Sequence, residues 1–213
     1  MKLDKKAMLL YVVTDRTWLG ENDLASQVEE TIKAGATFVQ LREKNMPNSE
    51  FVQEAAQIKK LTDKHGIPFV INDNIEVALA VDADGVHVGQ SDMNAKDVRA
   101  LIGNDKILGV SAVTVEQAVS AEQNGADYIG VGAVFATSTK HDADTVSMET
   151  LKRICEAVSI PVVAIGGICE ENILQLKGTG IDGVAVISAI FAKPDIGRAT
   201  ENLRRLSEQT VEK

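Results

Sequence analysis

The chain has 213 residues, of which 45% are hydrophobic and 25% are charged, as is usual for a soluble globular protein with a sizeable core. Its formal net charge of −9 argues against a nucleic-acid-binding or anionic-membrane surface, because both need a basic face. The two cysteines form no CxxC pair, the start lacks the apolar region of a signal peptide, and no apolar run approaches ~18 residues. These features predict a cytoplasmic protein that binds neither nucleic acid nor membrane.

Short apolar, β-branched runs alternate with amphipathic stretches along the whole chain. The predicted strands cover residues 9–13, 37–41, 68–71, 85–88, 107–110, 128–131, 162–165 and 183–187. The predicted helices cover residues 22–34, 49–65, 74–80, 95–102, 114–124, 147–158, 170–177 and 195 to the C-terminus. The strands are almost continuously hydrophobic, as expected for parallel strands that are buried on both faces.

A short motif recurs at the predicted junctions between a helix and the next strand. Gly35-Ala36-Thr37, Gly125-Ala126-Asp127 and Gly180-Ile181-Asp182 each place a glycine at a helix end, just before a strand. Eight strand–helix units of this kind predict a single (β/α)8 barrel domain over residues 1–213, with a short N-terminal extension at 1–8. An open doubly wound sheet is the alternative, but no GxGxxG follows the first strand.

The loops that follow the strands of such a barrel meet at one mouth, where active sites lie. After the second strand comes Gln40-Leu41-Arg42-Glu43-Lys44. Side chains alternate across a strand, so Gln40, Arg42 and Lys44 share one face, while Leu41 and Glu43 share the other with Val39. The donor-rich face suits an anion, and arginine is well shaped for phosphate. The alternative is a half-solvated strand end.

Two acidic residues follow adjacent strands, Asp73 after the third and Asp92 after the fourth. They can therefore share one site, and paired carboxylates are hard oxygen ligands that suit Mg²⁺ together with substrate phosphates. For each aspartate the alternative is a helix N-cap or a turn.

The last strands offer a second anion site. Gly166-Gly167 follows the seventh strand, Ile187-Ser188 ends the eighth, and loops at these places of a barrel often bind phosphate through backbone N–H groups. The long loop after the sixth strand adds the hydroxyls of Thr137, Ser138 and Thr139 and the cation Lys140. Two anion sites imply two substrates, one with a diphosphate and one with a monophosphate.

No Ser-His-Asp or Cys-His set is evident. His65 is expected at a helix C-terminus and His87 as a hydrogen-bonded core histidine, while the role of His141 stays open. We expect no reactivity from Cys169, which follows the Gly-Gly turn.

This ordered set of motifs resembles the thiamine phosphate synthase family over nearly the whole chain. The most specific pieces are Gln40 to Lys44, Ile71-Asn72-Asp73, Gly85 to Asp92, Gly109-Val110-Ser111-Ala112, and Thr137 to Lys140. The resemblance implies a transferase. It would join a hydroxymethylpyrimidine diphosphate to a thiazole phosphate, carboxylated in the family, to form thiamine monophosphate and release pyrophosphate by Mg²⁺-assisted dissociative substitution.

The resemblance also implies roles for individual residues. Gln40, Leu41, Arg42, Glu43, Lys44, Asn72, Ser111 and Lys140 would bind the pyrimidine diphosphate, and of these Arg42, Lys44, Ser111 and Lys140 would be catalytic. Thr137, Ser138, Thr139, Gly167, Ile187 and Ser188 would bind the thiazole phosphate. Asp73 and Asp92 would hold one Mg²⁺ per active site. A homo-oligomer is compatible with the sequence.

The chain departs from the family pattern at four positions. Ala133 and Ala136 replace common prolines, Val113 replaces a frequent histidine, and Ser147 replaces a frequent glycine. These departures bear on turnover rate, and the alanines are expected to loosen the loop over the mouth.

Three other functions compete with the synthase. The related thiazole tautomerase relies on a histidine where this chain has Val113 and does not need Asp73, Asp92 or Lys140. A barrel that senses thiamine precursors would bind them without turnover. A generic phosphate-sugar enzyme would need an acid–base pair at the mouth, and none is convincing.

Overall fold

The computed structural model describes residues 3–20, 23–137 and 145–212. Its strands are all parallel and form one closed barrel in sequence order, with β8 paired to β1. They are β1 Leu10–Val13, β2 Phe38–Leu41, β3 Phe69–Asn72, β4 Gly85–Val88, β5 Ile107–Ala112, β6 Tyr128–Val131, β7 Val162–Ile165 and β8 Gly183–Val186. The barrel prediction is confirmed, and the β1–β8 pairing excludes an open sheet.

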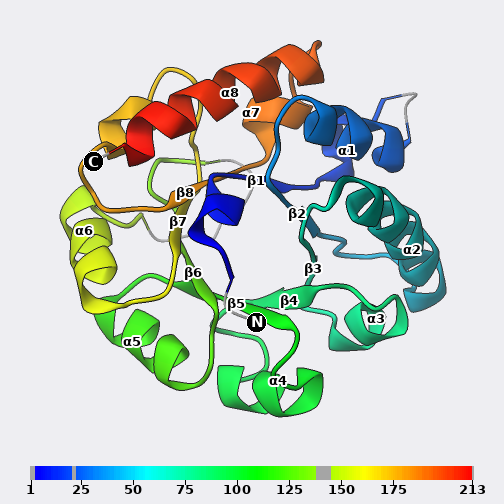
Figure 1. Ribbon diagram of the computed structural model, residues 1–213, viewed down its shortest axis with the longest axis horizontal. Helices are drawn as coiled ribbons and strands as arrows, with labels where there is room; N and C mark the ends of the chain where they lie inside the picture. Colours follow the sequence, from blue (N-terminus) through cyan, green and yellow to red (C-terminus); the bar gives the residue numbers. More distant parts are fainter. Residues whose placement is uncertain (1–2, 21–22, 138–144, 213) are drawn as a thin grey trace.

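A ring of helices surrounds the strands (Figure 1). The α-helices are α1 Leu24–Lys33, α2 Asn48–His65, α3 Ile75–Ala80, α4 Ala95–Ile102, α5 Val115–Gln123, α6 Met148–Ala157, α7 Ser188–Phe191 and α8 Ile196–Val211. Three 3₁₀ helices join them, η1 Lys5–Met8, η2 Arg16–Trp18 and η3 Ile173–Leu176. No helix in the described part of the chain is long and apolar enough to cross a membrane.

The helix predicted over residues 170–177 is wrong, because only the four-residue η3 forms there. The Asn172 side chain accepts a hydrogen bond from the Cys169 N–H and donates one to the Gly167 carbonyl. These local bonds hold the segment in a tight turn, an alternative to helix that asparagine readily offers. The sequence also missed α7, which is too short to show a helical period.

Side-chain alternation divides each strand between two cores. Val39 and Leu41 of β2 face outward into the layer between strands and helices, whereas Phe38 faces the barrel interior. The interior cluster consists of Met8, Tyr11, Val13, Phe38, Val70, Tyr128, Val163 and Ala185. Met8, from η1, is fully buried in this cluster. The polar side chains of the strands are thereby concentrated at the opposite end.

The N-terminal ends of the strands are tied together by a repeated contact. Asp84, Asp127 and Asp182 each precede an even-numbered strand and accept a hydrogen bond from the first or second N–H of the odd-numbered strand before it, at 2.8–2.9 Å. The Thr37 hydroxyl plays the same part for the Leu10 N–H of β1. The recurring junction motif is therefore a structural device of this end.

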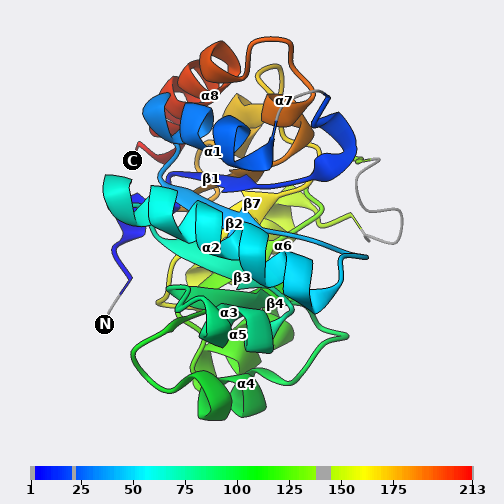
Figure 2. The ribbon, with the colours of Figure 1, turned by 90° about the vertical axis from the view of Figure 1, so that its right-hand side faces the viewer.

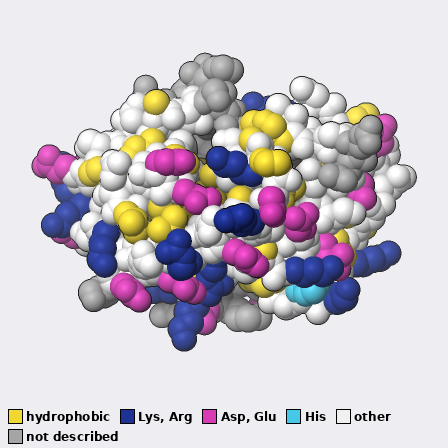
Figure 3. Space-filling view, turned by 90° about the horizontal axis from the view of Figure 1, so that it is seen from above, with side chains coloured by type: hydrophobic (Ala, Val, Ile, Leu, Met, Phe, Trp, Pro, Cys, Tyr) yellow, Lys and Arg dark blue, Asp and Glu magenta, His cyan; other side chains and the backbone are white. Residues whose placement is uncertain are grey.

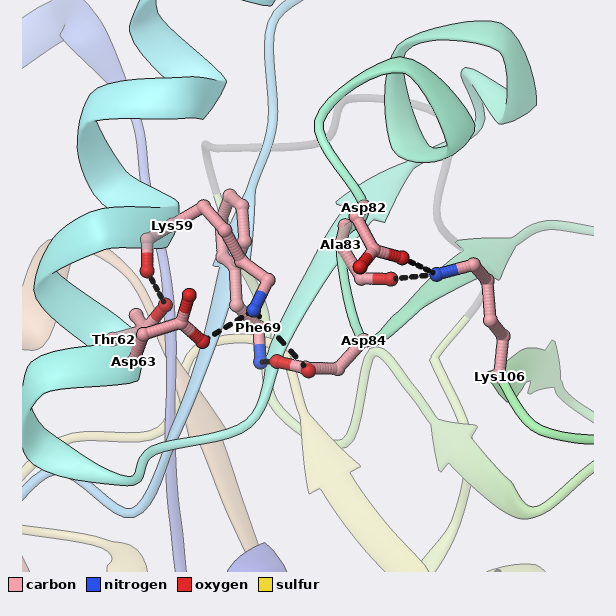
Figure 4. Close-up of polar contacts among 8 residues, drawn as sticks. All are labelled: Lys59, Thr62, Asp63, Phe69, Asp82, Ala83, Asp84 and Lys106. Carbon is pink, nitrogen blue, oxygen red and sulfur yellow. Dashed lines mark hydrogen bonds and ion pairs between the residues drawn. The ribbon is translucent and has the colours of Figure 1, made fainter.

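Lysines neutralise the same end of the barrel. Figure 4 shows Lys59 of α2 between Asp63 and Asp84, and Lys106 bonded to Asp82 at 2.7 Å and to the Ala83 carbonyl.

The opposite end carries the loops that follow the strands. Figure 2 shows the two ends side-on, with η1 and the end of α8 on the left. On the face seen in Figure 3, acidic and basic side chains are interspersed.

Candidate active site

A cavity of about 530 Å³ opens at the C-terminal ends of the strands. The predicted site residues that line it are Gln40, Arg42, Lys44, Asn72, Asp73, Asp92, Ser111, Thr137, Gly167, Ile187 and Ser188. They come from loops and strand ends that are distant in sequence. The barrel thus brings the two predicted anion sites into one cavity.

Two residues of the second-strand motif do not line this cavity. Leu41 is fully buried between the strands and the helices. The Glu43 side chain lies outside the cavity, where its carboxylate accepts a hydrogen bond from Arg16 at 2.8 Å. Their side chains therefore do not face the cavity, and a contact of these two residues with substrate stays a prediction. Ser138, Thr139, Lys140 and His141 lie outside the described residues.

Glu43 belongs to a separate cluster beside the motif. Arg16 also contacts Glu54 at 2.5 Å, so one guanidinium bridges two carboxylates. Burial and the neighbouring Glu54 raise the pKa of Glu43 to about 7, and Arg16 opposes that rise. This cluster ties the segment after β2 to η2 and α2.

The cationic wall of the cavity comes from the loop after β2. The backbone N–H of Arg42 donates to the Thr14 hydroxyl at 3.1 Å, which ties the loop to the end of β1. Arg42 is partly buried and Lys44 is exposed, and both line the cavity. A guanidinium and an ammonium on one wall form an electropositive surface that suits a polyanion.

Asp73 and Asp92 face each other across the loops after β3 and β4. Burial of the Asp73 carboxyl group and the adjacent Asp92 carboxylate raise the pKa of Asp73 to about 6, while Asn72 and Arg42 oppose the rise. Asp92 also accepts a hydrogen bond from the Gly89 N–H at 2.7 Å. The helix caps belong instead to Asn74 and Asn94, so neither aspartate is an N-cap.

This donor set fits a hard divalent cation such as Mg²⁺. Two carboxylates that repel each other gain stability from a cation placed between them, and oxygen ligands suit Mg²⁺. Among residues 3–20, 23–137 and 145–212, no group of three or more His, Cys, Asp or Glu side chains could hold a metal ion. A cation here would therefore complete its shell with water, amide and substrate oxygens.

The opposite wall is built from the ends of β7 and β8. Gly166 and Gly167 have φ values of +99° and +64°, and a Cβ on Gly167 would lie 2.4 Å from the Ala136 carbonyl oxygen. Only glycine therefore fits beneath the loop after β6. The short α7 starts at Ser188, and the first amides of a helix have no partner within it. This wall offers backbone N–H groups and a hydroxyl to an anion.

A polar network that the sequence did not predict lies on the floor of the cavity. Gln40 donates to the Tyr11 hydroxyl, which hydrogen-bonds to Tyr128 at 2.7 Å. His87 joins Tyr128 to Ser111 through its two ring nitrogens, each at 2.9 Å. His87 is thus the hydrogen-bonded core histidine that was expected, and it also lines the cavity. Inward-facing polar side chains on five strands were the available signal.

Two of the four departures from the family pattern, Ala133 and Ser147, have local explanations. The loop after β6 is held to the end of β7, because the Val134 and Phe135 amides donate to the Ile165 and Gly166 carbonyls. Its start at Ala133 is therefore anchored without proline. Ser147 caps α6 by accepting a hydrogen bond from the Thr150 N–H at 3.1 Å, which glycine could not do. Val113 lines the cavity.

Cations, a carboxylate pair and a glycine-rich loop at the mouth of a (β/α)8 barrel define the class of phosphate-binding barrel proteins. The family model of thiamine monophosphate synthase matches residues 10–190. The chain therefore belongs to the thiamine monophosphate synthase family.

Individual relatives agree with this assignment. The chain is 56% identical to thiamine-phosphate synthase of Clostridium tetani over 91% of its own length and 93% of the relative's. It is 57% identical to the enzyme of Ruminiclostridium cellulolyticum, with 91% and 92% covered. Among solved structures, thiamine phosphate pyrophosphorylase from Pyrococcus furiosus is 41% identical, with a TM-score of 0.90 over 98% of this chain and 99% of that one.

Proposed function

We propose that this chain is a thiamine phosphate synthase. It is a transferase that condenses 4-amino-2-methyl-5-hydroxymethylpyrimidine diphosphate with 4-methyl-5-(2-phosphoethyl)thiazole, or its carboxylated form, and releases pyrophosphate. The observation that carries this proposal is the single cavity in which a cation and carboxylate wall faces a glycine and serine wall. Two walls of this kind suit two phosphorylated substrates held side by side.

The diphosphate belongs at the wall formed by the loops after β2, β3 and β4. Arg42 and Lys44 would bind its oxygens directly, and Asn72 adds an amide beside the carboxylate pair. Asp73 and Asp92 would hold one Mg²⁺, which when bound would neutralise charge on the leaving diphosphate. The thiazole phosphate would bind at Gly167, Ile187 and Ser188, together with Thr137, which lines the same cavity.

Catalysis then requires little covalent chemistry from the protein. As the C–O bond to diphosphate breaks, negative charge grows on the leaving group, and Arg42 and Lys44, which line the cavity, would oppose it. The electron-rich aminopyrimidine would stabilise the positive methylene carbon that remains, and the thiazole nitrogen would attack it. Holding both rings in one cavity supplies orientation. No protein nucleophile is needed.

Lys140 lies outside the described residues and stays a proposed catalytic cation. If it reaches the leaving group, Lys140→Ala should lower kcat/KM at least tenfold, about 1.4 kcal/mol of transition-state stabilisation. Wild-type kinetics in that variant would remove Lys140 from the mechanism.

Pyrophosphate release tests the proposal directly. We expect release only when both substrates are present, and we expect EDTA to abolish it. A control with either substrate alone separates condensation from simple hydrolysis. Folded protein that binds the thiazole phosphate but releases no pyrophosphate would favour the tautomerase or the sensor.

The cavity itself favours the synthase over those alternatives. An apolar side chain, Val113, lines it at the position where the tautomerase relies on histidine. The facing pair Asp73 and Asp92, which neither isomerisation nor binding of a thiazole needs, lies at the same mouth. A cytoplasmic location and the absence of a nucleic-acid partner stay predictions, and sedimentation would test whether the chain forms a homo-oligomer.

A further inference from the structure

A continuous chain of hydrogen bonds crosses the barrel beneath the proposed pyrimidine site. It runs from Gln40 of β2 through Tyr11 of β1, Tyr128 of β6 and His87 of β4 to Ser111 of β5. Its four links measure 2.5, 2.7, 2.9 and 2.9 Å. Gln40, the two tyrosines and His87 are buried, and both ends of this series of hydrogen bonds line the cavity together with Tyr11 and His87. The floor therefore joins two substrate-facing groups that lie three strands apart.

Which group donates in each of these hydrogen bonds follows from the donors that each side chain possesses. The Gln40 amide nitrogen can only donate, so the Tyr11 oxygen accepts that bond. The Tyr11 hydroxyl must then give its one proton to Tyr128, since no other acceptor contacts it among the described residues. Tyr128 in turn donates to His87 Nδ1.

The far end of the chain is determined in the same way. A neutral imidazole that accepts at Nδ1 carries its proton on Nε2, so His87 donates to the Ser111 oxygen. The Ser111 hydroxyl proton is then directed toward the cavity. At the near end, Gln40 lines the cavity and uses its amide nitrogen on Tyr11, and no hydrogen bond is found for its carbonyl oxygen among the described residues, so this oxygen is the group that Gln40 can offer to a substrate. The site thus presents an acceptor at Gln40 and a donor at Ser111.

Exchanging the donor and acceptor roles at Gln40 would exchange them at Ser111 as well. If the Gln40 amide turned over, Tyr11 would donate to its carbonyl, Tyr128 to Tyr11, and His87 Nδ1 to Tyr128. Ser111 would then have to donate to His87 and could only accept from a substrate. Burial raises the pKa of Tyr11 and of Tyr128 well above the ordinary value, so neither hydroxyl loses its proton to break this coupling.

We propose that Tyr11, Tyr128 and His87 are positioning residues that set Gln40 as an acceptor and Ser111 as a donor, and thereby select an aminopyrimidine over its 4-oxo counterpart. The exocyclic amine donates to the Gln40 carbonyl, and a ring nitrogen accepts from the Ser111 hydroxyl. A 4-oxo ring places an acceptor against the Gln40 carbonyl instead. The inference rests on the proposed function, because it concerns recognition of the pyrimidine ring.

The test compares two substrates in wild type and in Tyr128→Phe, with Mg²⁺ present. Phenylalanine keeps the ring that packs on Tyr11 and Phe38 but removes the central hydroxyl of the chain. We expect wild type to prefer the amino diphosphate over the 4-oxo diphosphate in kcat/KM by at least a hundredfold. In Tyr128→Phe that ratio should fall at least tenfold, because both directions of the chain become accessible.

Phe38→Leu is the matched control. Phe38 packs against Tyr11, with ring centroids 4.5 Å apart, but contributes no hydrogen bond. This variant should disturb the floor while keeping the substrate ratio. The inference is overturned if Tyr128→Phe lowers kcat/KM equally for both substrates, or if Phe38→Leu erodes the ratio as strongly. Should Tyr128→Phe not fold, Tyr11→Phe removes the hydroxyl that accepts from Gln40 and makes the same test.

Calorimetric binding of the two diphosphates, without the thiazole phosphate, separates this inference from the proposed function. A preference for the amino compound without any pyrophosphate release would contradict the synthase and support the inference. Pyrophosphate release without such a preference in wild type would do the opposite.

Discussion

The two ends of the barrel handle acidic side chains in opposite ways. At the N-terminal end, Asp84, Asp127 and Asp182 each accept a backbone N–H and lie beside Lys59, Arg99 and Lys5, respectively. At the C-terminal end, Asp73 and Asp92 face each other, and Asn72 and Arg42 only partly oppose the rise in the pKa of Asp73. Carboxylates at the first end hold neighbouring strands together through hydrogen bonds. Those at the second end repel each other and could bind a cation. Stability and function are thus separated along the barrel axis.

The titration of matched aspartates shows the same contrast. Lys106 lowers the pKa of Asp82 at the N-terminal end, while burial and Asp92 raise that of Asp73 at the mouth. Both residues have positive φ values, +52° and +60°. Two aspartates with similar backbone conformations therefore have pKa values shifted in opposite directions, and substitution of each can test the cause.

The largest effect should come from the mouth. Asp92→Asn keeps an acceptor for the Gly89 N–H but removes the charge that would hold Mg²⁺. We expect kcat/KM to fall at least a hundredfold, ~2.7 kcal/mol, and the Mg²⁺ concentration for half-maximal rate to rise. Steady-state kinetics over a Mg²⁺ series measures both. Unchanged Mg²⁺ dependence would remove Asp92 as a ligand, and Asp97→Asn on the exposed side of α4 serves as control.

The next effect should come from the opposite end. Asp127→Ala leaves the Leu108 N–H without its side-chain acceptor and Arg99 without its carboxylate. We expect the free energy of unfolding to fall by ~2 kcal/mol, with kcat per folded molecule unchanged. Urea unfolding measures the loss. Glu201→Ala, at an exposed position of α8, should stay within ~0.5 kcal/mol of wild type. An equal loss of unfolding free energy in both variants would contradict a structural role for the Asp127 junction.

Gly167→Ala should affect one substrate more than the other. The added Cβ would press on the Ala136 carbonyl and shift the loop over the proposed thiazole phosphate site. We expect KM for the thiazole phosphate to rise about tenfold, ~1.4 kcal/mol, with a smaller change for the pyrimidine diphosphate. Gly178→Ala is the control, since Gly178 also has a positive φ but open space around it. Equal changes in the two KM values would contradict this placement.

The smallest effect should be a gain in stability. A raised carboxyl pKa means that the contribution of Asp73 to stability is present below its unfolded pKa near 3.8 and is lost as pH rises through about 6. In EDTA, Asp73→Asn should therefore stabilise the protein at pH 7. The gain should be only ~1 kcal/mol, because Asp73 as a whole is exposed at the mouth although its carboxyl group is partly desolvated, and solvent screens its charge. Thermal unfolding at pH 4 and pH 7 measures the gain, which should disappear at the lower pH.

Asp82→Asn is the matched variant at the other end. Its lowered pKa means that the carboxylate contributes stability above its unfolded pKa, and this contribution is lost as pH falls through the folded value. The variant should therefore destabilise the protein at pH 7 and match wild type in acid. Asparagine tolerates the positive φ at both sites. The same sign of change in both variants would end the proposed contrast between the two ends.

Much of the fold and part of the site follow from local pattern. The β-branched runs predict all eight strands to within a few residues, since a strand buried on both faces needs an unbroken apolar sequence. Strand alternation also separates Gln40, which lines the cavity, from Leu41, which does not. Transfer of the whole motif from the family nevertheless included Leu41 and Glu43, because a sequence match does not distinguish side chains that face opposite ways.

What the sequence by itself determined is the order of elements, the barrel, and the polar residues at the strand ends, because these depend on the periodicity of neighbouring residues. Only the tertiary structure decided that Asp73 and Asp92 face each other, since their separation depends on how two loops pack. It alone joined Tyr11, Tyr128 and His87 into one hydrogen-bonded chain. Hydrogen bonds across a closed barrel link residues more than one hundred positions apart, as Tyr11 and Tyr128 are, and no local pattern encodes such a contact.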